Sequence, residues 1–146
     1  MKELEKFLYQ KIPLSKHMQI QVIELSEKEA KLLCPLSANY NHMNTAFGGS
    51  LSAGLLLACY AWFFNVLKSK GIDTHVVVKQ SKINFIHPVE HDFIVSCKAP
   101  PKSDYEKLLK ILTKKDRAKI QLNGTASVGE KICVQMDAEF VAIKSN

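Results

Sequence analysis

Six segments have the patterns of β-strands: apolar and polar residues alternate in residues 18–25, 117–128 and 131–144, and the other three are short apolar runs or rich in β-branched residues. In the clearest segment every second residue from Ala118 to Val128 is apolar or glycine, and the residues between are polar or charged. Pro35 indicates that the second segment lies at a sheet edge or near its own end. The predicted strands cover residues 18–25, 30–36, 74–89, 91–99, 117–128 and 131–144.

The order of these strands predicts how they pair. Only Gly129 and Glu130 separate the last two strands, so we expect a tight hairpin there. We also expect the third and fourth strands to be joined by a hairpin turn at residues 87–91. Strands that come in adjacent pairs favour a largely antiparallel sheet. The last strand is predicted to turn inward Ile132, Val134, Met136, Ala138 and Phe140.

Two segments carry apolar residues at intervals of three and four, which is the period of an amphipathic helix. Residues 1–11 place Leu4, Phe7 and Leu8 on one face, and Pro13 ends the pattern. Residues 103–115 have a similar apolar stripe. They begin with Ser103 and Glu106, at the spacing of a capping box.

One long apolar segment has a different character. Residues 41–67 contain no Asp, Glu, Lys or Arg, and from Gly49 to Lys70 the spacing suits a helix. Twenty helical residues span roughly 30 Å, enough to cross a bilayer. However, interspersed serines, Gly54 and Asn65 dilute its hydrophobicity, and the strands need an apolar layer against their inward faces. We therefore favour a helix in the core of a protein.

These patterns predict an α+β fold in which a curved antiparallel sheet of about six strands wraps around the long apolar helix. Gly54 is expected to let a strand backbone come close to the helix. The helix residues expected to be buried together are Leu51, Leu55, Leu56, Leu57, Trp62, Phe63 and Phe64.

Composition is consistent with a single domain over residues 1–146, because the chain is 47% hydrophobic and has no repeat or linker. A net charge of +6 suits acidic ligands, but basic residues do not alternate with aromatic ones as in single-strand nucleic-acid binders. The N-terminus lacks a signal-peptide core. The four cysteines lie far apart in apolar runs, so we expect reduced thiols and a cytoplasmic location rather than disulfides or zinc.

The pair Gly48-Gly49 opens the apolar helix. The first N–H groups of a helix have no partner within it and carry partial positive charge, so glycines there leave them open to a ligand oxygen. The glycines alone favour a tight turn into the helix, because isolated glycine pairs usually mark turns. Polar neighbours favour a pocket with a polar end and an apolar floor. These neighbours are Asn41, His42, Asn44, Thr45 and Ser50.

The string "NTAFGGSL", after a strand and before a long apolar helix, resembles the thioesterase-like hotdog domain at the C-terminus of YiiD-like bacterial acetyltransferases. The resemblance extends from about Leu14 to Ile143, and we expect a free-standing version of that domain. It implies hydrolysis or dehydration of acyl groups on coenzyme A or acyl carrier protein. It also implies a dimer or tetramer with the site between subunits.

Carried over residue by residue, the resemblance is incomplete. In many hotdog thioesterases an Asn precedes His-Gly-Gly, and a carboxylate on the helix activates water. Asn41 matches that Asn, whereas Phe47 stands in place of the His and Leu56 in place of the acid. No Asp or Glu occurs between Glu29 and Asp73, so the base cannot come from this helix.

Ser81 and His42 are alternative groups that could hold or activate the water. The string "HPVEH" at residues 87–91 is a weaker candidate for a metal site, and the interpretation includes no metal and no cofactor.

The leading hypothesis is an acyl-thioester hydrolase whose substrate carbonyl oxygen binds the amides of Gly48 and Gly49, with Asn41 orienting the thioester or the water. The remaining substrate contacts are expected from Asn44, Thr45, Phe47 and Ser50, with Lys79, Lys82 or Lys102 meeting the coenzyme's phosphates. The alternative is a module that binds acyl-CoA or acyl carrier protein and has lost the catalytic acid. Neither hypothesis includes nucleic acid or a membrane.

Overall fold

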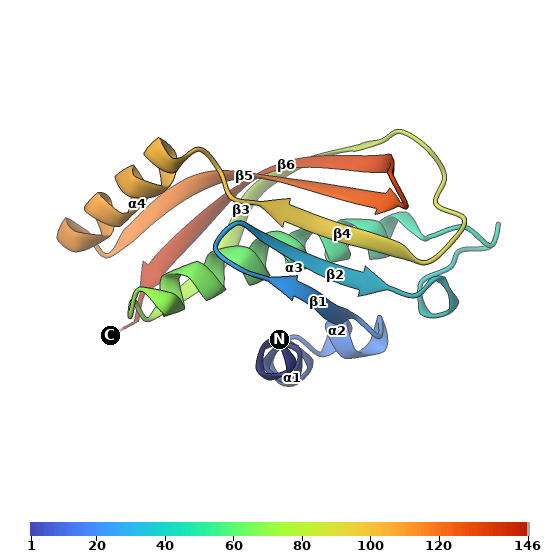
Figure 1. Ribbon diagram of the computed structural model, residues 1–146, viewed down its shortest axis with the longest axis horizontal. Helices are drawn as coiled ribbons and strands as arrows, with labels where there is room; N and C mark the ends of the chain where they lie inside the picture. Colours follow the sequence, from blue (N-terminus) through green and yellow to red (C-terminus); the bar gives the residue numbers. More distant parts are fainter. Residues whose placement is uncertain (146) are drawn as a thin grey trace.

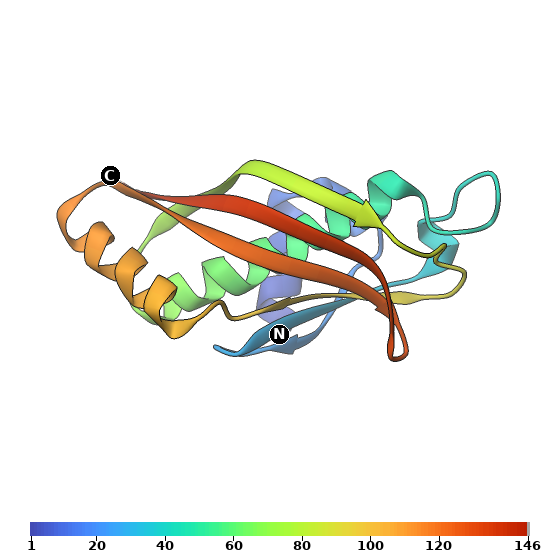
Figure 2. The same cartoon turned by 90° about the horizontal axis from the view of Figure 1, so that it is seen from above.

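The computed structural model describes residues 1–145 as an antiparallel sheet curved around one long helix (Figures 1 and 2). The strand order is β1-β2-β4-β5-β6-β3, and every neighbouring pair is antiparallel. The predicted α+β arrangement is therefore confirmed. The strands are β1 (Gln21–Leu25), β2 (Glu29–Cys34), β3 (Thr74–Phe85), β4 (Phe93–Lys98), β5 (Arg117–Val128) and β6 (Lys131–Lys144). The helices are α1 (Lys2–Lys11), α2 (Pro13–His17), the 3-10 turn η1 (Leu36–Ala38), α3 (Gly48–Ser69) and α4 (Lys102–Lys114).

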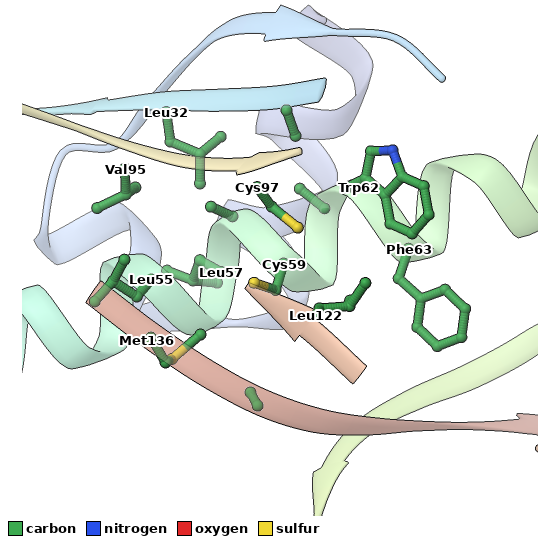
Figure 3. Close-up of a cluster of buried hydrophobic side chains, with 14 of the residues drawn as sticks. Leu32, Leu55, Leu57, Cys59, Trp62, Phe63, Val95, Cys97, Leu122 and Met136 are labelled. Carbon is green, nitrogen blue, oxygen red and sulfur yellow. The ribbon is translucent and has the colours of Figure 1, made fainter. Parts of the chain in front are cut away.

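Helix α3 is long and apolar enough to cross a membrane, but most of its apolar window is buried within the protein. Figure 3 shows Leu55, Cys59 and Phe63 of α3 among apolar side chains of the surrounding strands. Each fully buried Leu or Phe contributes roughly 1.5–3 kcal/mol. The sheet therefore supplies the apolar layer that the sequence of α3 requires.

Two glycines let α3 lie close to the sheet. A Cβ atom on Gly54 would lie 3.1 Å from Cγ1 of Val95 and 3.5 Å from Sγ of Cys34. A Cβ atom on Gly124 of β5 would lie 3.3 Å from Cδ2 of Leu55. The close approach predicted at Gly54 is thus made by strand side chains, and not by a strand backbone.

One face of α3 is not covered by the sheet. Ala53, Leu56, Tyr60 and Phe64 follow each other at intervals of three or four residues and are only partly buried. The prediction that Leu56 and Phe64 are fully buried was wrong. Phe64 instead stacks on Phe7 of α1, with ring centroids 5.0 Å apart.

The segment between β3 and β4 is not a hairpin, contrary to the sequence-based expectation. β3 pairs only with β6, whereas β4 lies between β2 and β5. The connecting residues cross the end of the molecule, where the N–H of Ala46 donates to the Val89 carbonyl at 2.7 Å. A side-chain oxygen of Asp92 accepts a hydrogen bond from the N–H of Leu36 at 2.8 Å. This crossing ties the loop before α3 to the sheet.

The hairpin between β5 and β6 forms as predicted, with Gly129 at φ 59°. A register shift follows at Ala126 and Ser127, which pair with Val134 and Ile132. Because the shift inserts one extra residue into β6, Ile132 is 44% exposed rather than inward. Val134 and the inward positions after it are buried as expected.

The predicted capping box of α4 is absent. The helix begins at Lys102, with Pro101 at the N-cap and no side-chain capping bond, so Ser103 already lies within the first turn. The apolar stripe of this helix was predicted correctly, and Leu108 and Leu112 are buried.

Candidate active site at the first turn of α3

The first turn of α3 offers free backbone N–H groups. The first intrahelical bond runs from the N–H of Leu51 to the Phe47 carbonyl at 3.0 Å. Within residues 1–145, the N–H groups of Gly48, Gly49 and Ser50 have no acceptor, and no side chain caps the helix. These groups carry the partial positive charge of the helix N-terminus. They are therefore suited to bind an anionic or partially negative oxygen.

Two aromatic rings flank this turn. The Phe47 ring lies over Gly49, so a Cβ atom placed on Gly49 would overlap the ring. The Phe85 ring lies 3.8 Å from the position of a Cβ on Gly48. Both rings are 56% exposed. The turn thus combines polar N–H groups with an apolar rim that faces solvent.

The loop before the turn is held by its own side chains. The Oδ1 atom of Asn41 accepts hydrogen bonds from the N–H groups of Met43 at 2.9 Å and Thr45 at 3.1 Å. Its Nδ2 atom donates to Oγ1 of Thr45 at 2.9 Å. Both ends of the Asn41 amide are therefore used inside the loop. In this chain Asn41 and Thr45 therefore shape the loop before α3.

The other loop candidates lie farther from the first turn. His42 and Asn44 are exposed at the loop tip, and Asn44 has φ 60°. Ser50, by contrast, is half-buried in the first turn itself. Of the predicted loop and helix residues, the structure brings together Phe47, Gly48, Gly49 and Ser50.

Ser81 lies on β3, on the same face of the sheet as α3. Its register partner is Ala138, which is buried toward the helix, while Ser81 itself is exposed on the edge strand. Four residues separate it from Phe85, which is roughly 13 Å along a strand. Ser81 is therefore on the correct face but not adjacent to Gly48 in a single chain.

The predicted lysines are not near the first turn. Lys79 forms an ion pair with Glu139 at 3.7 Å, and Lys82 is the register partner of Asp137, both on the outer face of the sheet. Lys102 forms an ion pair with Glu106 on α4 at 3.9 Å. Helix α4 and the loop before α3 lie at opposite ends of the molecule (Figure 1). Within one chain, these lysines do not approach a ligand bound at Gly48.

An apolar groove of about 240 Å³ runs along the uncovered face of α3. Ala53, Leu56 and Tyr60 are in register with Gly49 on the helix surface, at steps of four, seven and eleven residues. Burial raises the pKa of Tyr60, so its hydroxyl stays protonated. The groove is lined by Ile12, Leu14, Ala53, Leu56, Leu57, Tyr60, Val76, Val78 and Phe140.

Sequence reasoning assigned no role to the groove residues Ala53 and Tyr60. Helical periodicity places both residues on the same face as Gly49. This face could not be distinguished from the others because the helix is apolar on all sides. The two groove walls come from residues far away in sequence, at 12–14 and 76–78. No periodicity within one segment could have joined them.

The described residues contain no obvious catalytic acid or metal site. Leu56 lies in the groove at the position where the resemblance placed an acid. Across residues 1–145 no group of three or more His, Cys, Asp or Glu side chains could hold a metal ion. The four cysteines are buried, and burial raises the pKa of Cys34 to about 12. A thiol in that state is a poor nucleophile.

A larger hollow of about 520 Å³ lies elsewhere, between α4 and the outer face of β4 and β5. Its lining includes the polar side chains of Ser96, Asn123 and Thr125. It has no connection to the free N–H groups of α3, so we assign the candidate site to the first turn.

Comparison with known proteins gives a consistent result. The family described as "Putative thioesterase (yiiD_Cterm)" matches residues 1–144. No curated protein matches the chain.

Several solved structures share the fold. A protein of unknown function from Chlorobaculum tepidum TLS superposes with a TM-score of 0.92 at 24% identity, covering 99% of this chain and 94% of that chain. A "putative thioesterase" from Shewanella oneidensis has a TM-score of 0.88 at 23% identity, covering 97% and 96%. A protein from Pseudomonas aeruginosa described as "Probable Thioesterase" has a TM-score of 0.83 at 18% identity, covering 99% and 97%.

Proposed function

Because the chain belongs to the family described as "Putative thioesterase (yiiD_Cterm)", we propose that it hydrolyses acyl thioesters of coenzyme A or acyl carrier protein. One observation carries the proposal. The uncapped first turn of α3 lies one helical turn before an apolar groove that follows the same helix from Ala53 to Tyr60. A thioester has the matching shape, with a polar carbonyl group attached to an apolar chain.

In the proposed reaction the thioester oxygen accepts hydrogen bonds from the N–H groups of Gly48 and Gly49. Water adds to the carbonyl carbon, and the negative charge that develops on the oxygen is stabilised by these donors and by the α3 dipole. The C–S bond then breaks, and the thiolate takes up the proton that the water released. The acyl chain lies in the groove beyond Ala53.

Two side chains are candidates for holding or activating the water. His42 is exposed on the loop, and Ser81 lies on the inner face of the edge strand β3. We propose that Ser81 acts from a second copy of the chain. β3 is twelve residues long and, within the described chain, pairs on one side only, so a second β3 can pair with it. Exposed Val77 and Ile86 support such an interface.

The four free, buried thiols are compatible with a reducing compartment, and we propose that the protein acts in the cytoplasm.

The test is thiol release from purified protein incubated with acyl-CoAs of several chain lengths. A thiol reagent follows the free coenzyme A, and a Gly48→Pro variant serves as the matched control because it lacks one of the two proposed donors. We expect release that depends on chain length and on the Gly48 amide. If no acyl-CoA releases thiol faster than buffer, hydrolysis is excluded.

A second function, binding without hydrolysis, is favoured by one specific observation. Leu56 occupies the position of the acid, and residues 30–72 contain no carboxylate. Calorimetry with an acyl-CoA distinguishes the two functions. Tight binding with the thioester still intact after hours would support the binding module.

A further inference from the structure

The apolar groove ends at a set of stacked aromatic rings, and we infer that Tyr60, Phe64 and Phe7 set the maximum length of the acyl chain, with an optimum near ten carbons. This inference rests on the proposed function, since it assumes that an acyl group occupies the groove. It adds the substrate class, medium-chain acyl thioesters, and names the residues that select it.

The direction of the groove follows from the helix. Gly49, Ala53, Leu56 and Tyr60 occupy one face of α3, and all are at least partly exposed. A chain that starts at the Gly49 N–H first passes the Phe47 ring, which lies over Gly49, and then Ala53 and Leu56 before it reaches the Tyr60 ring. Side chains of α2 and its approach form one wall, and side chains of β3 form the other. The occupant that fits an apolar groove beginning one turn after the free N–H groups is the acyl chain of the bound thioester.

The far end is closed by three parallel rings. The ring centroids of Tyr60 and Phe64 are 5.6 Å apart, and those of Phe64 and Phe7 are 5.0 Å apart. In each pair the two ring planes are inclined to each other by only 8°. Behind the rings is a second hollow of about 140 Å³, which Phe7, Phe64 and Leu25 help to line. Tyr60 lines only the first hollow and Phe64 only the second. The rings therefore separate two hollows.

The length of the groove gives the size of the acyl chain. Eleven residues separate Gly49 from Tyr60, which is about 16 Å at 1.5 Å per helical residue. An extended chain advances about 1.2 Å per bond, because three backbone bonds span about 3.5 Å. Leaving about 4 Å for contact with the Tyr60 ring, roughly ten carbons fit.

This geometry predicts that kcat/KM depends on acyl-chain length with a sharp upper limit. Each methylene that enters the groove raises the affinity by up to about fourfold. Because the stacked rings close the groove, a further methylene finds no room at its end, so kcat/KM should stop rising near ten carbons and fall for longer chains.

The experiment measures kcat/KM for acyl-CoAs from about four to about eighteen carbons in the unchanged protein and in variants. Tyr60→Ala and Phe64→Ala open the barrier and should move the optimum to longer chains by two or more carbons. Ala53→Leu narrows the groove and should move it to shorter chains, so the test does not depend on one variant that fails to fold. Tyr105→Ala removes a ring that packs against Trp62, outside the groove, and should leave the optimum unchanged.

A second readout does not require catalysis. Free fatty acids of the same lengths compete with a fluorescent fatty acid for the groove, and the same limit near ten carbons is expected. If hydrolysis occurs but no groove variant moves the limit, the inference is wrong and the proposed function stands. If nothing is hydrolysed but fatty acids bind with that limit, the proposed function fails and the length selection stands.

A third outcome would also overturn the inference. If Tyr60→Ala changes the oligomeric mass and leaves both profiles unchanged, the uncovered face of α3 is a contact between subunits.

Discussion

The two ends of α3 are built differently. At the end of the helix, the N–H of Lys70 donates to the Leu67 carbonyl at 3.1 Å, and the N–H of Ile72 donates to the same carbonyl at 3.0 Å. Gly71 has φ 74° and donates to the Lys68 carbonyl at 2.9 Å. At the beginning of the helix, Phe47 is the N-cap residue and no side chain accepts a bond from the first turn.

The difference separates a structural end from a candidate functional end. A Ser, Thr, Asp or Asn at the N-cap stabilises a helix by about 0.5–2 kcal/mol relative to a non-capping residue. None of the described helices has a side-chain cap, but α3 is the helix along which the apolar groove runs. We therefore interpret the open N-terminus as a site that binds a ligand oxygen, and the bonded C-terminus as a means of fixing the helix in the sheet.

The largest effect is expected when one N–H group at the open end is removed. In Gly48→Pro, proline at the first helical position keeps the helical φ but deletes the N–H. Phe47, with φ −65° and ψ 134°, already has the conformation required before proline. We expect turnover to fall about 10²–10³-fold with little change in melting temperature. Gly48→Ala keeps the N–H, its Cβ is in ordinary contact with Phe85, and it should remain active.

The next effect is expected when the open end is given a cap. Phe47→Asp provides a carboxylate that accepts hydrogen bonds from the free N–H groups and interacts favourably with the helix dipole. We expect the protein to become more stable by about 0.5–2 kcal/mol in urea unfolding and turnover to fall roughly tenfold or more. Phe47→Ala removes the ring without adding a cap. A stabilised Phe47→Asp variant with full activity would contradict the functional interpretation of this end.

The bonded end should respond in stability alone. Gly71→Ala forces an L-residue into the left-handed region at φ 74°, which costs about 1–2 kcal/mol. Asn tolerates this conformation better than Ala, so Gly71→Asn should lose less stability than Gly71→Ala. Chemical unfolding measures both losses, while turnover per folded molecule stays constant. A large loss of activity in folded Gly71→Ala would mean that the two ends are not independent.

The smallest effect concerns the middle of α3, where Cys34 of β2 contacts Gly54. Burial raises the pKa of Cys34 to about 12, above the ordinary value of 9.0. The pKa of Cys34 is higher in the folded state than in the unfolded chain, so the neutral thiol contributes to folding stability. This contribution is complete below pH 9 and is lost as the pH rises toward 12. Between pH 9 and 10 the free energy of unfolding falls by about 1 kcal/mol through this thiol. The Cys97 thiol and burial also raise the pKa of Cys59, so Cys34→Ala should weaken the pH dependence of urea unfolding without abolishing it.

Local patterns in the sequence were sufficient for most of the fold. The alternation in residues 117–128 and the apolar run from Gly49 predicted a strand and a core helix, because both depend only on neighbouring residues. The position of β4 could not be predicted this way. Its pairing with β2 and β5 depends on contacts between distant segments. Likewise, the inward position of Ile132 was lost to one inserted residue, which periodicity alone does not reveal.

The candidate site was less accessible to sequence reasoning. Gly48 and Gly49 were identified because a helix N-terminus has the same free N–H groups in any protein. The Asn41 amide was assigned to the ligand, but its bonds within the loop depend on the turn at residues 41–45. Lys79 and Lys82 were chosen for their charge alone, and the strand then directed them to the outer face.

The pairing of β3 has a consequence for synthesis on the ribosome. Among the described strands, β3 is held in the sheet only by β6, residues 131–144, which are made about fifty residues later. Until those residues emerge, the nascent chain contains a long apolar helix that the sheet covers only in part. Such a species is prone to associate with other exposed chains. We expect it to be a client of chaperones, and loss of residues 131–144 should yield insoluble material rather than a smaller folded protein.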